Sequence, residues 1–242
     1  MGKLQKTVEA LEKAVSLDSE NTDAYLKLAE MSIVIRDYQK ALGYIDKALR
    51  VDDLNAKGYM LRGVVLMETG DTIRGIRNFQ KAIDVKQDYL EAHVQLGTLY
   101  ALKKSDLAID YFNNALNIDP ANIDVRYSLG MYYQETGRYE KAIQSYEFLL
   151  EQDPSFYIAD FNIGYIYLVY LKDFKSAVDY FTRTIDLNPE YTEAYYNRGF
   201  AYELLKDPEN SRKDYEKVLE LHPNYEKAIE GMNRITEYLE GN

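Results

Sequence analysis

The stretch that decides the fold is residues 129–154, LGMYYQETGRYEKAIQSYEFLLEQDP. Apolar residues recur at helical spacing on both sides of Thr136-Gly137-Arg138, where a glycine at the C′ position ends the first run. The second run ends at Gln152-Asp153-Pro154, because proline lacks the backbone N–H that a continuing helix needs. The stretch therefore predicts two short helices joined by a tight turn.

The same pattern returns along the chain about every 34 residues. Two columns of small residues carry it: Ala29, Gly63, Gly97, Gly130, Gly164 and Gly199; and Ala41, Gly75, Ala108, Ala142, Ala177 and Ser211. One residue is missing between Gly97 and Ala108, and one is extra between Gly164 and Ala177. We expect both changes at the turn inside a repeat, where length changes are tolerated best. No segment alternates as a β-strand would, so the sequence predicts an all-α fold.

The small residues have a packing role. Glycine or alanine in these columns lets two helices approach closely, and an aromatic side chain then fills the space between neighbouring helix pairs. Residues 93–120 read His93-x₂-Leu96-Gly97-x₂-Tyr100, then Ala108-x₃-Phe112-x₂-Ala115, then Pro120. This pattern resembles the tetratricopeptide repeat family. The departures are few: tyrosine often replaces the family's tryptophan, and Asp53 and Gln87 stand where proline is usual.

The resemblance implies a right-handed superhelical solenoid of antiparallel helix pairs, with the first helices lining a concave groove. It divides the chain into six repeats at 22–55, 56–89, 90–122, 123–156, 157–191 and 192–225. Residues 1–21 match only the second helix of an incomplete repeat, and residues 226–242 are expected to form a capping helix. Because the chain starts in mid-repeat, we expect it to be a piece of a longer protein.

Composition excludes several classes of function. The 242 residues contain no cysteine and only two histidines, His93 and His222, so we expect no metal centre, cofactor or catalytic residue. His93 occupies an aromatic column, which predicts a core imidazole. With 40 acidic against 29 basic residues, the chain is not expected to bind nucleic acid or an anionic membrane surface.

No segment has the apolar length of a membrane span or the profile of a signal peptide. The compartment stays open between the cytoplasm and, if a signal preceded this sequence, the periplasm or the exterior.

The resemblance also predicts a binding surface. It implies that positions 2, 5, 6, 9, 12 and 13 of each repeat face the groove. In the C-terminal half these positions hold large apolar side chains and amides: Tyr127, Met131, Phe161, Asn162, Tyr165, Tyr196, Asn197 and Phe200. An exposed patch of this kind would mark an interaction site, and the amides could hold a peptide main chain. The alternative is that these residues pack on one another.

Acids at position two predict the character of a partner. Asp23, Glu91, Asp124 and Glu193 hold this position in four repeats. They disfavour an acidic peptide and favour a protein or peptide with apolar or aromatic anchors and some basic character.

Three charges stand in columns that are normally apolar: Arg126, Asp160 and Arg198. Burying a charge without a partner lowers the stability of the fold by several kcal/mol. We therefore predict that Asp160 pairs with Arg126 or Arg198.

The sequence as a whole predicts a non-enzymatic scaffold that binds a peptide or partner segment in the groove. Two alternatives stay open. The repeats are an accessory domain of a longer enzyme, secretion or envelope-assembly component, or the chain self-associates through its N-terminal helix as a homo-oligomer.

Overall fold

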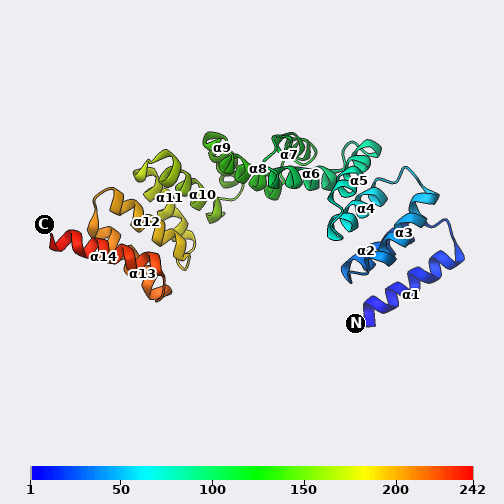
Figure 1. The fold of residues 1–242 in the computed structure, drawn as a ribbon, viewed down its shortest axis with the longest axis horizontal. Coiled ribbons are helices and arrows are strands. Elements are labelled where there is room, and N and C mark those ends of the chain that lie inside the picture. Colours follow the sequence, from blue (N-terminus) through cyan, green and yellow to red (C-terminus); the bar gives the residue numbers. More distant parts are fainter. Residues whose placement is uncertain (1, 242) are drawn as a thin grey trace. The chain divides into compact units, whose positions relative to one another are not determined.

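The computed structural model describes residues 2–241, and the side chains of residues 5–241. Every regular element in that part of the chain is helical (Figure 1), which confirms the predicted all-α class. The chain divides into two compact units, which meet in sequence at Val125 and Arg126. We call them the N-terminal unit and the C-terminal unit.

The helices of the N-terminal unit are short and follow one another closely in sequence. They are α1 (Gly2–Leu17), α2 (Thr22–Val34), α3 (Tyr38–Val51), α4 (Ala56–Glu68), α5 (Thr72–Val85), α6 (Leu90–Leu102) and α7 (Leu107–Ile118). Helix α8 (Ile123–Glu135) crosses the boundary between the units. The C-terminal unit continues with α9 (Tyr139–Gln152), α10 (Tyr157–Tyr165), the π-helix η1 (Ile166–Leu171), α11 (Phe174–Leu187), α12 (Thr192–Leu204), α13 (Pro208–Leu221) and α14 (Glu226–Glu240).

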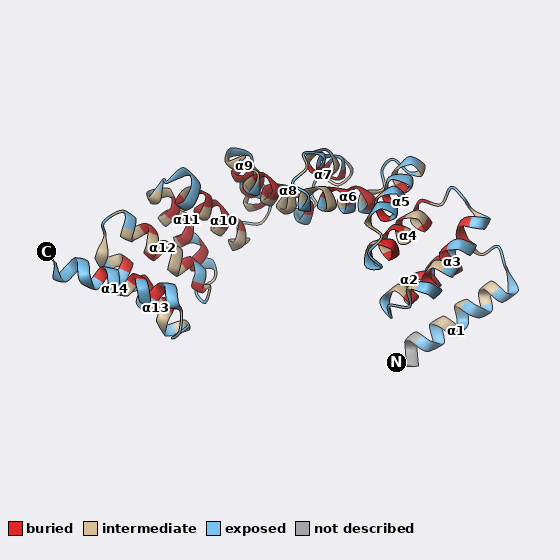
Figure 2. Ribbon diagram, viewed as in Figure 1, coloured by how far each residue is buried: buried red, intermediate tan, exposed pale blue. Residues whose placement is uncertain are grey.

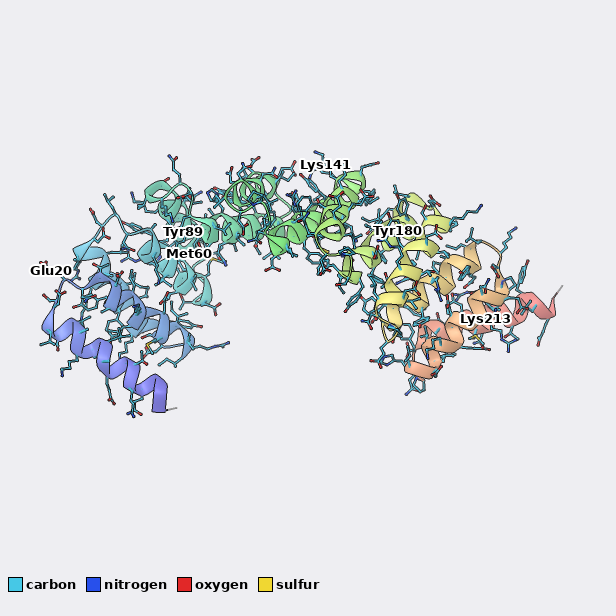
Figure 3. The ribbon with its side chains drawn as sticks, turned by 180° about the vertical axis from the view of Figure 1, so that it is seen from behind. Glu20, Met60, Tyr89, Lys141, Tyr180 and Lys213 are labelled. Carbon is cyan, nitrogen blue, oxygen red and sulfur yellow. The ribbon has the colours of Figure 1, made fainter. Side chains whose placement is uncertain are left out.

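Within each unit, consecutive helices pack as antiparallel pairs that stack on the next pair. In the N-terminal unit α2 packs on α3, α4 on α5 and α6 on α7, and in the C-terminal unit α10 packs on α11 and α12 on α13. The buried residues lie along the helix sides that face each other (Figure 2). One example is Met60 on α4, which is buried in a cluster that Tyr89 partly covers (Figure 3).

The glycine column allows this close packing, as predicted. A Cβ on Gly63 would lie 2.5 Å from the Phe79 ring, and one on Gly164 would lie 2.9 Å from the Phe181 ring. Both phenylalanines are fully buried. The first helix of a pair therefore needs glycine where the aromatic residue of the second helix crosses it.

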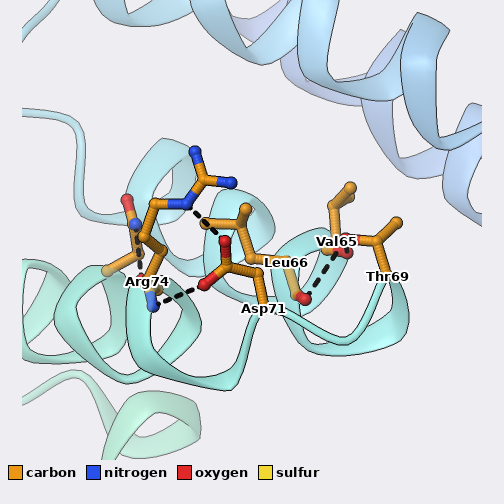
Figure 4. A network of polar contacts seen from close by, with 6 residues as sticks. Val65, Leu66, Thr69, Asp71 and Arg74 are labelled. Carbon is orange, nitrogen blue, oxygen red and sulfur yellow. Dashed lines mark hydrogen bonds and ion pairs between the residues drawn. The ribbon is translucent and has the colours of Figure 1, made fainter.

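Each turn inside a repeat contains one residue in the left-handed conformation. These residues are Arg36, Gly70, Lys104, Gly137, Lys172 and Lys206. In the second repeat, Thr69 Oγ1 donates to Val65 O at 2.9 Å, and the Asp71 carboxylate then caps α5 by accepting from Arg74 N at 3.0 Å (Figure 4). The turn thus satisfies backbone groups that the helix ends leave open.

The two length changes fall in different places. The missing residue shortens the start of the second helix of its repeat, because Lys104 in the turn is followed four residues later by Ala108 instead of five. The extra residue does not lie in the turn, so that prediction was wrong. It lies before Lys172, inside the first helix, and the chain absorbs it as the π-helix η1.

No helix in the described part of the chain combines the length and the apolar character needed to cross a membrane.

Candidate functional site

The predicted site residues lie on the first helices of three repeats, all of them in the C-terminal unit. Tyr127 and Met131 lie on α8; Phe161, Asn162 and Tyr165 on α10; and Tyr196, Asn197 and Phe200 on α12. Asn162 is buried and the other seven are partly exposed.

Asn162 connects α10 to α8. Its Nδ2 donates to the Tyr127 hydroxyl at 3.2 Å and lies 4.0 Å from Met131 Sδ. The amide group thus fixes the relative position of two aromatic-bearing helices, and its donor is used inside the protein. Asn197 uses its donor within its own helix, to Glu193 O at 2.8 Å. Both amides keep their side-chain oxygens free of hydrogen bonds from described residues.

The aromatic rings of the site form an almost continuous chain of contacts. Phe161 lies at its centre, with its ring centroid 5.0 Å from that of Tyr191 at a near right angle and 6.5 Å from that of Tyr165. It also contacts the buried Phe181 at 5.6 Å. Tyr165, Phe161 and Phe200 together cover a core cluster that includes Phe181. The inner edges of these rings are therefore held by packing, while their outer edges stay partly exposed.

The two ends of the surface pack in the same way. The Tyr127 ring lies 5.9 Å from Tyr146 and 6.0 Å from Phe156, edge to face with the latter. On α12, the Tyr196 ring lies 5.4 Å from that of Tyr225, and burial raises the pKa of Tyr196 above its ordinary value. Burial also raises the pKa of Tyr191, to about 12. The phenols of Tyr191 and Tyr196 are therefore neutral at physiological pH and present rings and hydroxyl donors rather than charge.

Tyr170 is an aromatic residue of this surface that the sequence did not single out. It lies in η1, and its ring stacks on Tyr139 at 4.4 Å and meets Tyr165 edge to face at 6.1 Å. The extra residue of this repeat was the signal that could have found it, because the insertion gives this repeat alone a π-helix in the described chain.

The prediction for Asp160 was wrong. Its carboxylate, which is fully buried, lies 3.0 Å from the Arg183 guanidinium and pairs with neither Arg126 nor Arg198. The ion pair with Arg183 does not have the geometry of a hydrogen bond, and neither oxygen of the Asp160 carboxylate accepts a hydrogen bond from a described residue. Burial raises the pKa of Asp160 to about 6, although the Arg183 charge acts to lower it.

The two arginines have other partners. The Arg198 guanidinium binds the Asp214 carboxylate through two hydrogen bonds of 2.8 and 2.7 Å and donates to Thr182 Oγ1 at 3.0 Å. Arg126 instead lies over the Phe148 ring at 4.2 Å. Both ion pairs, Asp160 with Arg183 and Arg198 with Asp214, thus join the two helices of one repeat.

His93 is buried, as predicted. Its Nε2 lies 2.9 Å from Gln87 O, and its ring lies 6.0 Å from that of Tyr111. The described residues contain no group of three or more carboxylate or imidazole side chains that could hold a metal ion.

The comparisons with known proteins identify the repeats. Three models of the tetratricopeptide repeat match the chain. One matches residues 192–225, the second matches residues 111–144, and the third matches two segments, residues 90–122 and 161–191. The fold is similar to that of the C-terminal part of a tetratricopeptide repeat-containing protein from Cytophaga hutchinsonii. The TM-score is 0.83 at 21% identity, over 95% of each chain.

Curated relatives share the repeats at low identity. BBSome complex member BBS4 from Bos taurus is 22% identical over 258 residues, which span 91% of this chain and 49% of that protein. RNA polymerase II-associated protein 3 from Homo sapiens is 32% identical over 126 residues, which span 52% of this chain and 19% of that protein. The chain therefore spans half the length of these relatives or less. It is a tetratricopeptide repeat protein.

Proposed function

We propose that this chain is a non-enzymatic scaffold that binds a peptide or an extended partner segment on the first helices of its C-terminal unit. The observation that carries the proposal is the set of partly exposed aromatic side chains on α8, α10 and α12, held in place by Asn162 and Phe181. A surface that is already ordered costs little entropy on binding, because only the partner has to become ordered.

The partner is expected to have apolar or aromatic anchors and basic residues. The rings supply apolar contact area, and residues 126–242 hold 21 acidic against 13 basic side chains. Glu135 on α8 and Glu193 on α12 are exposed and form no ion pair with described residues. An acidic peptide would meet repulsion here, and a basic one would gain favourable contacts.

A selection from a library of random twelve-residue peptides tests this function. The proposal predicts that the chain enriches binding peptides, and that Phe200→Ala and Tyr196→Ala weaken their binding about tenfold or more. The matched control is Tyr238→Ala, which removes an exposed tyrosine on α14. Failure to enrich any peptide, or equal binding by the Phe200→Ala variant and the control, would contradict the proposal.

Self-association is a second candidate, favoured by exposed apolar side chains on the first two helices. Leu17 at the end of α1 is 79% exposed and Val34 at the end of α2 is 75% exposed. Sedimentation velocity of the chain and of a Leu17→Lys variant, over a hundredfold range of concentration, tests it. A concentration-dependent shift that the substitution abolishes supports self-association, and a constant monomer contradicts it.

A third arrangement is that the repeats serve as an accessory domain of a longer enzyme or of a secretion or envelope-assembly component. We consider this arrangement because the chain spans only 49% and 19% of the length of two curated relatives. The sequence of the complete reading frame tests it directly.

A further inference from the structure

The π-helix η1 gives the fifth repeat a feature that the other repeats lack in the described chain. The residues that follow Tyr165 continue the helix with one extra residue, and Lys172 in the left-handed conformation then ends it. Three consecutive apolar or aromatic residues of η1 are exposed: Val169, Tyr170 and Leu171, each to about 40%. A π-helix keeps a large side chain at the surface here that a regular turn would place differently.

Three tyrosines from three elements meet at this point. Tyr170 of η1 stacks on Tyr139 of α9 with ring centroids 4.4 Å apart and an interplanar angle of 17°. Tyr165 of α10 meets Tyr170 at 6.1 Å and 74°. The rings thus form two walls at nearly a right angle, and we call Tyr139, Tyr165 and Tyr170 the tyrosine corner cluster.

One carboxylate near the cluster in sequence, four residues before Tyr139, has no ion pair with a described residue. This residue is Glu135, which is exposed at the end of α8. Burial is the main reason that the pKa of Tyr170 is raised, and electrostatic interactions with Tyr165, Tyr139 and Glu135 add to it, so the Glu135 charge acts on this ring. A cation near these rings would gain from both the carboxylate and the ring faces.

Seven of the 24 tyrosines, all outside the cluster, have a lysine or arginine over the ring in the described chain. Lys81 lies over the Tyr59 ring at 5.9 Å, Arg183 over Tyr180 at 5.4 Å and Arg198 over Tyr195 at 5.7 Å. Among the described residues, no lysine or arginine lies over the three rings of the tyrosine corner cluster. No cation of the described chain therefore occupies these three rings, and a cation of a partner can contact them.

We propose that the tyrosine corner cluster, together with Glu135, is a subsite that receives an arginine or lysine side chain of the bound partner. The inference rests on the proposed function, since Tyr165 belongs to both surfaces. The subsite adds one sequence requirement to the proposed function. The partner needs a basic residue next to the segment that contacts Phe161 and Phe200. The insertion in this repeat is then a specificity element.

The test is a comparison of peptides selected from the same random twelve-residue library by the wild-type chain and by two variants. Tyr170→Ala removes one wall, and Glu135→Gln removes only the charge. The peptides selected by the wild-type chain should share an arginine or lysine at one aligned position. Replacing that residue with citrulline or norleucine should weaken binding about tenfold, within the range of a cation–π contact joined to a carboxylate.

The variants should differ in this preference and keep the rest of the motif. Tyr170→Ala should bind the basic and the neutral peptide equally, Tyr170→Phe should retain most of the preference, and Glu135→Gln should reduce it severalfold. Glu151→Gln, which removes an exposed carboxylate on α9, is the matched control and should change nothing. Because Glu135→Gln is a conservative change at an exposed residue, it keeps the test valid if Tyr170→Ala is destabilised.

The outcomes separate the two proposals. Selected peptides that depend on Phe200 but carry no shared basic residue would overturn the subsite and leave the proposed function standing. A shared basic residue whose contribution is the same in wild type, Tyr170→Ala and Glu135→Gln would also overturn it. If no peptide is selected at all, both the subsite and the proposed function are contradicted.

Discussion

The two units present different side chains at the same position of the repeat. At position five the N-terminal unit has Leu26, Met60 and Val94. Leu26 and Met60 are only 2% and 8% exposed, although this position was expected to face a groove, and Val94 is partly exposed. The C-terminal unit has Tyr127, Phe161 and Tyr196 there, all partly exposed. Residues 126–242 hold 17 of the 24 tyrosines and six of the eight phenylalanines. Leu26 and Met60 thus fit between neighbouring helices, whereas all three rings of the C-terminal unit stay partly exposed at this position.

This difference shows that the repeat pattern determines how the helices pack, whereas the side chains on the surface vary from one repeat to the next. Both units use the same glycine-to-aromatic packing, with Gly63 on Phe79 in one and Gly164 on Phe181 in the other. What distinguishes the C-terminal unit is the set of rings and buried charges added to that common scaffold. The predictions below first test the shared core and then the features that separate the units.

The largest effect is expected from emptying the core aromatic position in either unit. Phe79→Ala and Phe181→Ala each remove a fully buried ring and should each lower the free energy of unfolding by about 3 to 5 kcal/mol. Urea unfolding followed by circular dichroism measures the loss, with Tyr238→Ala as the exposed control. If one of the two substitutions had little effect, the units would not share a packing rule.

Filling the glycine column is expected to cost less. Gly63→Ala and Gly164→Ala place a Cβ 2.5 and 2.9 Å from a buried ring, whereas Gly43 on α3 has nothing within 4 Å of the same position. Relative to Gly43→Ala, which gains helix propensity, each should be less stable by about 2 kcal/mol in the same unfolding measurement. Equal stability of the three variants would mean that close helix approach is not what the column provides.

The pH dependence of stability should come from the C-terminal unit, because both buried carboxylates of the described chain, Asp160 and Asp214, lie there. The folded pKa of Asp160, about 6, is above the usual value of an unfolded aspartate, so the folded state binds more protons between about pH 4 and 6. The contribution of Asp160 to stability therefore falls as the pH rises through this window.

Replacing Asp160 tests this sign. Asp160→Asn should raise the free energy of unfolding by about 1 to 2 kcal/mol at pH 8 and change it little at pH 4. Asp214→Asn is the matched contrast, since it replaces one of the two oxygens that accept from Arg198 with a donor, removes the charge and should destabilise at pH 8. Thermal unfolding at both pH values distinguishes the two, and a loss of stability in Asp160→Asn at pH 8 would show that the Arg183 contact outweighs the cost of burial.

The smallest effect is expected at the turns, which the two units share. Arg36 in the N-terminal unit and Lys206 in the C-terminal unit have φ angles of 58° and 60°. Glycine avoids the strain of this conformation, so Arg36→Gly and Lys206→Gly should each stabilise by about 0.5 to 1 kcal/mol. Gly137→Ala should have the opposite sign. Melting temperatures that move the same way in all three variants would contradict this account of the turns.

Much of the fold could be predicted from the sequence because the repeat states each packing rule several times. The glycine and aromatic columns, the buried His93 and the turn at Gly137 follow from residues that occupy equivalent positions. What occurs once could not be predicted in this way. The extra residue before Lys172 fits the 34-residue period equally well as a longer turn or a π-helix, and only the backbone hydrogen bonds distinguish them.

The errors in the candidate site have the same origin. Position numbers place residues on a helix face, but they do not say which neighbouring helix lies nearest. Asp160 therefore pairs with Arg183 on the second helix of its own repeat, and Leu26 and Met60 are buried where a groove residue was expected. Tyr170 was missed because the insertion moved it out of every column.

The most direct test of the central claim is amide hydrogen exchange of the chain with and without a peptide selected from the random library. The account predicts slower exchange on the first helices of the C-terminal unit, at residues 157–171 of α10 and η1 and at residues 192–204 of α12. Helices α2 and α4 of the N-terminal unit should exchange at unchanged rates. Protection confined to α2 and α4, or to the second helices α9, α11 and α13, would contradict it.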